Sequence, residues 1–159
     1  MRSNENTEET LKNFVRQIYD SIQRGEIPEI RLKSRTKENI VLDSLLGVWK
    51  YGDQEVLRSA KKMDGAQFMA KTLYTIQFIL EMLGESKSST LREMYYISEG
   101  WKDYKFTAQD ESNLLVEDME VITELLREDF HLRPEENGAS IIGNITIEEK
   151  NRKNEFKRI

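Results

Sequence analysis

The sequence predicts a mainly α-helical fold with small β elements. Four segments, residues 7–24, 65–83, 90–98 and 111–128, place apolar residues three or four positions apart, the spacing of one helix face. Short apolar runs elsewhere are separated by glycine-containing turns, which is typical of β-hairpins. With 159 residues and no cysteine, the chain is long enough to bury a core and must do so without disulfides.

The N-terminal third is predicted to contain one helix and an extended region. Gly25 follows the helix at 7–24 and is placed to cap its C-terminus. The next stretch, "EIPEIRLKSR", alternates apolar and polar residues and begins with Pro28, which favours an edge strand. "NIVLDSLLGVWKYGD" then predicts a β-hairpin, with Ile40 and Leu42 on one strand and Val48, Trp49 and Tyr51 on the other.

The remaining helices follow in close succession. Residues 65–83 are the most apolar and are expected to form the central helix, ending at Gly84. Thr90 and Glu93 form a capping-box pattern at the start of the next helix, which Gly100 should end. The helix at 111–128 is expected to bury a stripe consisting of Leu114, Leu115, Ile122, Leu125 and Leu126.

Two short β segments, residues 141–142 and 145–147, are separated by Gly143-Asn144. Three helices followed by a β-hairpin is the order of a winged-helix (CAP-like) DNA-binding domain. We therefore expect an N-terminal helical extension over 1–26, a winged-helix domain over 27–149 and the start of a linker over 150–159.

Charge is distributed unevenly along the chain. The net charge is −5, yet residues 31–72 carry nine positive and five negative side chains and residues 103–136 carry three positive and eleven negative. This pattern fits ordinary solvated helix faces or a basic surface for phosphates. The DNA-contacting candidates are Arg35, Arg58, Lys61, Lys62, Lys87 and Ser89. The acidic run at 117–120 is expected to face water and to repel phosphates.

Two adjacent tyrosines lie in the stretch "STLREMYYISEGW", residues 89–101. On a helix that begins at Thr90, Tyr95 stacks over Leu91 on the apolar face and Tyr96 stacks over Arg92 on a charged face. Tyr96 is then either an ordinary surface aromatic or a nucleophile. A phenol with a pKa of about 10 is almost entirely protonated at neutral pH, so a nucleophilic tyrosine needs a nearby cation such as Arg92.

This stretch resembles the catalytic-tyrosine motif in the A subunits of type IIB DNA topoisomerases, the family of archaeal topoisomerase VI and the meiotic double-strand-break proteins. The similarity continues through "IPEIRLKSRTKENIVLD" and "GVWKYGDQEVLRSAKK" before it, and "KFTAQDESNLLVEDMEVIT" and "LREDFHLRPEENGASIIGNITI" after it. The resemblance implies that Tyr96 is the nucleophile, that Arg92 assists it, and that the tyrosine becomes linked to the 5′ end of the cut strand.

The same resemblance implies the partners and cofactors of the whole enzyme. These are double-stranded DNA, a second copy of the A subunit, and an ATPase B subunit, in an A2B2 heterotetramer that relaxes supercoils using ATP. In the family, Mg²⁺ is held by a Toprim domain with an Asp-x-Asp pair. No Asp-x-Asp occurs in this sequence, so we assign no metal ligand and expect a fragment that does not cleave DNA alone.

Several alternatives stay open at this point. The chain could be a winged-helix DNA-binding or interaction module without chemistry, or part of a meiotic-type breaker that does not religate. The apolar stripe of residues 7–24 could pack on the core of this chain or contact the B subunit. No apolar run reaches the roughly 20 residues that span a bilayer, and we expect a cytoplasmic protein.

Overall fold

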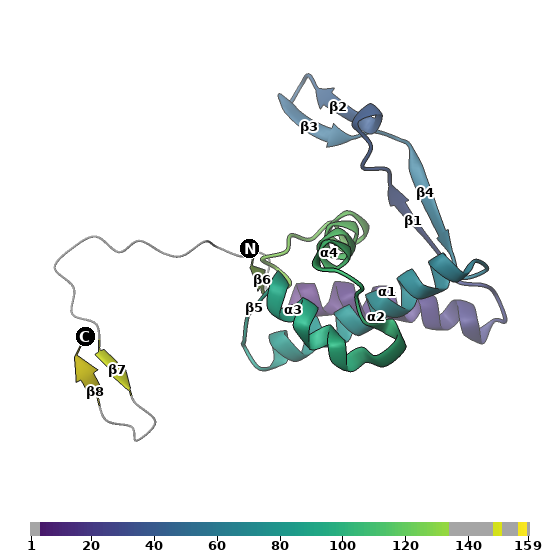
Figure 1. The fold of residues 1–159 in the computed structure, drawn as a ribbon. Coiled ribbons are helices and arrows are strands. Elements are labelled where there is room, and N and C mark those ends of the chain that lie inside the picture. Colours follow the sequence, from purple (N-terminus) through teal and green to yellow (C-terminus); the bar gives the residue numbers. More distant parts are fainter. Residues whose placement is uncertain (1–3, 134–147, 151–155, 159) are drawn as a thin grey trace.

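The computed structural model describes residues 4–133, 148–150 and 156–158 (Figure 1). In this part of the chain the helices are α1 (Asn4–Gln23), α2 (Met63–Gly84), α3 (Leu91–Ile97) and α4 (Gln109–Thr123), with the 3₁₀ turns η1 (Lys37–Asn39) and η2 (Ser98–Tyr104). The strands are β1 (Glu29–Lys33), β2 (Ile40–Asp43), β3 (Val48–Tyr51), β4 (Glu55–Ser59), β5 (Ser89–Thr90), β6 (Leu132–Arg133), β7 (Glu148–Lys150) and β8 (Phe156–Arg158). The predicted mainly α fold with a β-hairpin is confirmed.

The helices enclose one main apolar core. It takes residues from all four helices and from the segments that flank α4, because each helix has one apolar face that must be removed from water. Its fully buried members include Leu11, Ile76, Ile79, Met94, Phe106, Val116, Met119, Leu125 and Phe130. None of the helices in the described ranges is both long and apolar enough to cross a membrane.

Helix α1 ends as the sequence predicts. Gly25 adopts a φ of 71°, and its amide donates to the carbonyl of Ile22 while the amide of Glu26 donates to the carbonyl of Ser21. Glycine suits this left-handed position because it lacks a Cβ. Ile22, however, is exposed, so the predicted apolar stripe of α1 is buried only in its earlier turns.

A long two-stranded arm projects from the helical body (Figure 1). Its base is formed by β1 and β4, which pair antiparallel with Ile30 opposite Arg58. Its outer part is formed by β2 and β3, which pair antiparallel with Leu42 opposite Trp49. The predicted hairpin is therefore confirmed, and the extended segment at Ile30 and Leu32 is one side of the same arm.

The base of the arm is anchored by a second apolar cluster. Ile30 of β1 is buried with Ile18 of α1 and Met69 of α2, and Phe14 and Ile122 pack against them. The outer hairpin has no comparable support among the described residues, because every apolar side chain of β2 and β3 is exposed.

The buried stripe predicted for the last helix is partly wrong. Helix α4 ends at Thr123, because Glu124 turns into the left-handed region with a φ of 54°. Leu114 and Leu126 are exposed, whereas Leu115 is buried. The buried face of α4 consists of Ser112, Leu115, Val116, Asp118 and Met119.

The predicted wing, residues 141–147, lies outside the described residues, so the winged-helix assignment stays a prediction. Strands β7 and β8 pair antiparallel, with Glu149 opposite Lys157. Strands β5 and β6 pair in parallel, with Ser89 opposite Leu132. This last pair fixes the point at which the tyrosine helix α3 begins.

Candidate active site

The start of α3 is held by a complete capping box. The Thr90 side chain accepts a hydrogen bond from the Glu93 amide at 3.1 Å, and the Glu93 carboxylate accepts one from the Thr90 amide at 2.8 Å. These bonds lower the pKa of Glu93, with the backbone bond from Thr90 as the largest cause and the Ser89 hydroxyl next. The predicted cap is confirmed, and it fixes the first turn that carries Arg92.

The adjacent tyrosines face different surroundings. Leu91 and Met94 are buried, and Tyr95 packs against the same core while remaining partly exposed. Tyr96 is 56% exposed, and its ring lies 5.4 Å from the ring of Tyr95. The helical geometry therefore divides the two as predicted, and the Tyr96 side chain is accessible to a ligand from outside.

Arg92 lies beside the exposed tyrosine. Its Nε donates a hydrogen bond to the Tyr96 hydroxyl oxygen at 3.3 Å, and its guanidinium carbon lies 5.8 Å from the centre of the tyrosine ring. The two residues are one helical turn apart, which brings their side chains together without distortion. A guanidinium in this place favours negative charge on the phenol oxygen and on any phosphoryl group that approaches it.

The segment after α3 is fixed to the core by aromatic contacts. The ring of Tyr74 in α2 stacks on the rings of Trp101 and Tyr104 in η2, with ring centres 5.5 and 5.6 Å apart. The Ser98 hydroxyl donates to the Tyr95 carbonyl at 2.6 Å and accepts from the Phe106 amide at 3.3 Å. The tyrosine helix is thus tied at both ends, which fixes the backbone that carries Tyr96.

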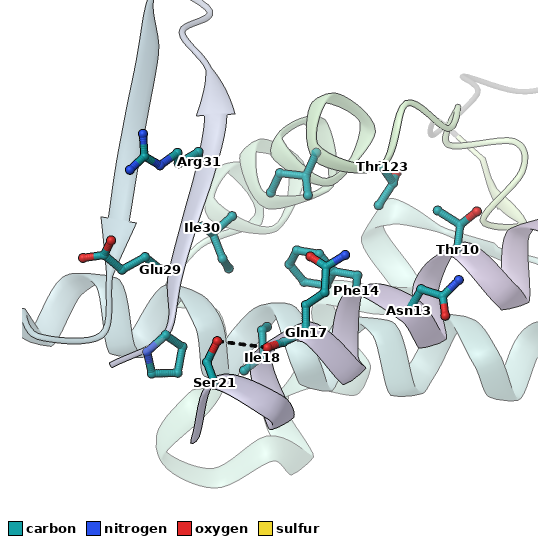
Figure 2. A pocket seen from close by; sticks show the side chains of 12 residues that line it. Thr10, Asn13, Phe14, Gln17, Ile18, Ser21, Glu29, Ile30, Arg31 and Thr123 are labelled. Atoms are coloured by element: carbon teal, nitrogen blue, oxygen red, sulfur yellow. Dashed lines mark hydrogen bonds between the residues drawn. The ribbon is translucent and has the colours of Figure 1, made fainter. Parts of the chain in front are cut away.

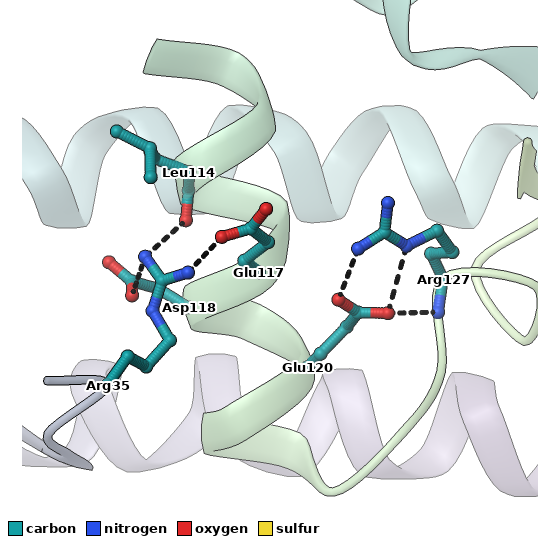
Figure 3. Close-up of polar contacts among 6 residues, drawn as sticks. All are labelled: Arg35, Leu114, Glu117, Asp118, Glu120 and Arg127. Atoms are coloured by element: carbon teal, nitrogen blue, oxygen red, sulfur yellow. Dashed lines mark hydrogen bonds and ion pairs between the residues drawn. The ribbon is translucent and has the colours of Figure 1, made fainter. Parts of the chain in front are cut away.

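Two of the basic candidates contact side chains of other elements of the fold. Arg35 forms ion pairs with Glu117 and with Asp118 of α4, the latter at 3.0 Å (Figure 3). Arg58 lies over the ring of Phe68 at 5.4 Å. Both guanidinium groups connect the arm to the helices, so a role in phosphate binding would compete with these contacts.

The other candidates lie at the two ends of α2. Lys61 and Lys62 are exposed just before the helix. Lys87 is exposed after it and forms an ion pair with Glu85. Ser89 is buried, and its hydroxyl donates to the Glu93 carboxylate at 3.1 Å. That these residues contact DNA stays a prediction, and for Ser89 the observed role is in the cap.

The acidic run on α4 does not simply face water, contrary to the sequence prediction. Asp118 is only 8% exposed, and burial raises its pKa despite the opposing charges of Arg35 and Arg58. Glu120 accepts hydrogen bonds from the Arg127 guanidinium at 2.9 and 3.2 Å (Figure 3). These carboxylates are structural partners of two arginines.

Two further buried polar contacts have no counterpart in the sequence analysis. Lys71 of α2 is buried and forms an ion pair with Glu111 of α4. Asn39 is buried at the bend of the arm. In the sequence, neither a single lysine in an apolar helix nor an asparagine before a strand indicates a buried contact. The partners concerned, Glu111 and Gln54, lie 40 and 15 residues away in the chain.

A groove of about 580 Å³ lies between α1, β1 and α4 (Figure 2). Phe14, Ile18, Ile30 and Ile122 line it together with polar residues such as Asn13 and Gln17. Neither Tyr96 nor Arg92 lines this groove, so it is separate from the candidate active site.

The described residues do not fit a magnesium site. Within residues 4–133, 148–150 and 156–158, no group of three or more His, Asp or Glu side chains is placed to hold a metal ion.

Comparison with known proteins places the tyrosine helix in a known family. Residues 67–132 match the family described as type IIB DNA topoisomerase. The chain is similar to the A subunit of type 2 DNA topoisomerase 6 from Natronomonas pharaonis, with 46% identity over 149 residues, covering 92% of this chain and 40% of the relative. It is also similar to the proteins of the same name from Archaeoglobus fulgidus (48% over 143 residues, 90% and 40%) and Methanosarcina acetivorans (48% over 142 residues, 89% and 38%).

The chain thus spans about 40% of the length of the curated relatives it matches. The matched region contains α3 and α4 and most of α2, and therefore both Tyr96 and Arg92. The resemblance that the tyrosine motif predicts is confirmed: residues 67–132 match the type IIB DNA topoisomerase family, and about nine tenths of the chain is similar to A subunits of type 2 DNA topoisomerase 6.

Proposed function

We propose that this chain is the catalytic-tyrosine part of the A subunit in a type IIB DNA topoisomerase. The observation that carries the proposal is the exposed side chain of Tyr96, whose hydroxyl lies 3.3 Å from the Arg92 Nε on a helix whose start is capped. The family match over residues 67–132 supports the class of reaction.

In the proposed reaction the Tyr96 phenol oxygen attacks a phosphorus atom of the DNA backbone. The phenol loses its proton as the new oxygen–phosphorus bond forms. The bond from phosphorus to the 3′ oxygen breaks, and that oxygen leaves and takes up a proton. The 5′ phosphate stays on Tyr96 as a phosphodiester, which keeps the energy of the broken bond and allows the strand to be resealed by the reverse steps.

Arg92 assists by stabilising negative charge. The attack develops charge on the phenol oxygen and on the non-bridging phosphoryl oxygens, and a fixed cation close to both lowers the barrier. Because Tyr95 packs against the core, Tyr96 is the phenol of the pair that a DNA strand can reach.

The remaining parts of the reaction belong to groups outside the described residues. Mg²⁺, which a Toprim domain holds in the family, would supply further neutralisation of phosphate charge. A partner B subunit would use ATP, and a second copy of the A subunit would cut the other strand. Together these would give transient double-strand breaks, through which a second duplex passes.

The proposal is tested by Tyr96→Phe in the complete A subunit that carries this chain, assembled with its ATPase partner. Covalent protein–DNA adducts trapped with detergent should disappear, while DNA affinity stays within about twofold because one hydroxyl is lost and the ring remains. Tyr95→Phe is the matched control and should retain adduct formation. Adducts that persist in the Tyr96 variant would leave a DNA-binding module without chemistry at this residue as the better description.

A further inference from the structure

One lysine in the turn after the tyrosine helix has a backbone conformation that suits glycine. Lys102, within η2, has a φ of 56° and a ψ of −120°. These angles are close to those of the first central position of a type II′ turn, which glycine dominates because it has no Cβ. Glu124 also has a positive φ, but its ψ of 28° lies in the left-handed helical region, which other residues enter more readily. Lys102 therefore occupies a strained position.

Aromatic packing on both sides of Lys102 holds the turn in place. Trp101 and Tyr104, which flank it, both stack on Tyr74 of α2. The ring of Trp101 also lies 5.5 Å from the ring of the buried Phe106. Backbone strain persists only where the surrounding structure maintains it, and it is concentrated at functional sites. A lysine at this position therefore indicates a use for its side chain that glycine would not provide.

The ammonium group of Lys102 is available to a ligand from outside. The residue is exposed, and within residues 4–133, 148–150 and 156–158 no carboxylate forms an ion pair with it. The nearby Lys105 is different, because it pairs with Glu99 at 2.8 Å. Asp103 follows Lys102 and is exposed as well. The single cation of η2 can therefore meet an anion without first breaking an ion pair in this part of the chain.

The position of Lys102 relative to Tyr96 follows from the helical segment that joins them. Lys102 comes six residues after Tyr96, which is about 9–12 Å along the axis at the rise of an α or a 3₁₀ helix. Phosphates of one DNA strand follow one another about every 3.4 Å along the duplex axis. On a strand that runs along α3, Lys102 thus lies beside a phosphate about three nucleotides from the one that Tyr96 meets.

We propose that Lys102 binds a backbone phosphate of the strand that Tyr96 attacks and thereby aligns this strand along α3. The inference rests on the proposed function, which supplies the DNA strand. An ammonium is a compact point charge that suits a single phosphate. The contact is independent of base sequence, because phosphate contacts set the position of a protein on DNA and do not read bases. The fixed turn reduces the conformational entropy that this contact costs.

The test is the salt dependence of DNA binding by the complete A subunit assembled with its ATPase partner. Duplex affinity is measured from about 50 to about 200 mM salt, with a metal chelator to keep the DNA intact. Loss of one phosphate contact should reduce the slope of log affinity against log salt by about 0.9. Lys102→Ala and Lys102→Gly should both show this change, and their deficit in affinity should shrink about 3.5-fold over this salt range.

Two further variants serve as controls for the charge. Lys102→Arg keeps the positive charge and should keep the slope. Lys12→Ala removes an exposed lysine of α1 that pairs with Glu8, and it should leave the slope unchanged. An unchanged slope in the alanine and glycine variants of Lys102 would overturn the inference. So would weaker binding of the B subunit with an unchanged slope, because that result would assign Lys102 to a protein contact.

Unfolding separates the charge of Lys102 from the strain in its backbone. Glycine relieves the strain and alanine keeps it, so in urea the 159-residue chain should have a higher midpoint with Lys102→Gly than with Lys102→Ala. The two variants should nevertheless share the same DNA defect. A defect in alanine alone would assign the effect to the turn and contradict phosphate binding. These readouts need no cleavage, so failure of the Tyr96→Phe adduct test and failure of this inference are distinguishable.

Discussion

Replacement of Arg92 tests how the phenol of Tyr96 is activated. The perturbation is Arg92→Ala in the complete A subunit with its partner. At 3.3 Å a guanidinium and a phenolate attract by about 1 kcal/mol in bulk water and about 5 kcal/mol at an effective dielectric constant of 20. Tyr96 is more than half exposed, so the loss should fall at about 1.5–3 kcal/mol, the range for hydrogen bonds to charged groups. This corresponds to a cleavage rate about 10- to 150-fold lower.

The assay is single-turnover cleavage of a duplex with a labelled 5′ end, stopped with detergent, with DNA affinity measured separately. Arg92→Lys keeps the charge but loses the planar donor group, so it should recover only part of the rate. Arg24→Ala is the matched control, because Arg24 is an exposed cation that pairs with Glu26 just beyond the end of α1. A rate within twofold of the unaltered enzyme, or a defect confined to DNA affinity, would refute the assigned role.

Three further predictions concern the elements that position the site. Thr90→Ala should lower the free energy of unfolding by about 1 kcal/mol, the usual value of an N-cap, while Thr90→Ser should leave it unchanged. Urea unfolding measures both variants. An unchanged midpoint for the alanine variant would contradict the role of Thr90 as a cap. Because the folded-state pKa of Glu93 is lowered, the stabilisation from its carboxylate should be present above its ordinary pKa and be lost as pH falls through the folded value, and Glu93→Gln should remove this part of the acid dependence. Arg35→Ala should destabilise the fold by about 1–3 kcal/mol at pH 7, since it leaves a buried carboxylate without its partner. The folded pKa of Asp118 is already raised, chiefly by burial. This loss should therefore become smaller as the pH falls towards that folded pKa and the carboxyl binds a proton, and Asp118→Asn should offset it. A loss that does not change with pH would argue against the pairing.

The sequence predicts the local features of this molecule well. Gly25, the Thr90–Glu93 capping box and the cross-strand order of Ile40, Leu42, Trp49 and Tyr51 all depend on residues within about a dozen positions of one another. Such features follow from backbone propensities and side-chain periodicity, which a short stretch contains in full. The separation of Tyr95 from Tyr96 is of the same kind, because it needs only the phase of one short helix.

The contacts that the sequence predicts wrongly or misses depend on distant residues. The acidic run on α4 is predicted to face water, because the distance in sequence between Arg35 and Asp118 hides their pairing. Leu114 is predicted to be buried, yet the core formed with α1, α2 and α3 selects the face with Leu115 and Met119. Tertiary packing thus determines which face of α4 is buried. The positions of the apolar residues alone predict a buried stripe that is too broad.

The central claim is that the Tyr96 oxygen becomes joined to the 5′ end of cut DNA. The most direct measurement is mass spectrometry of the trapped adduct after nuclease and trypsin digestion. Trypsin should release residues 93–102, in which Tyr95 and Tyr96 are the only tyrosines. Fragmentation of this peptide then distinguishes a nucleotide on Tyr95 from one on Tyr96. The account predicts a 5′ nucleotide on Tyr96. A nucleotide on Tyr95, or a covalent adduct that maps elsewhere in the protein, would contradict it.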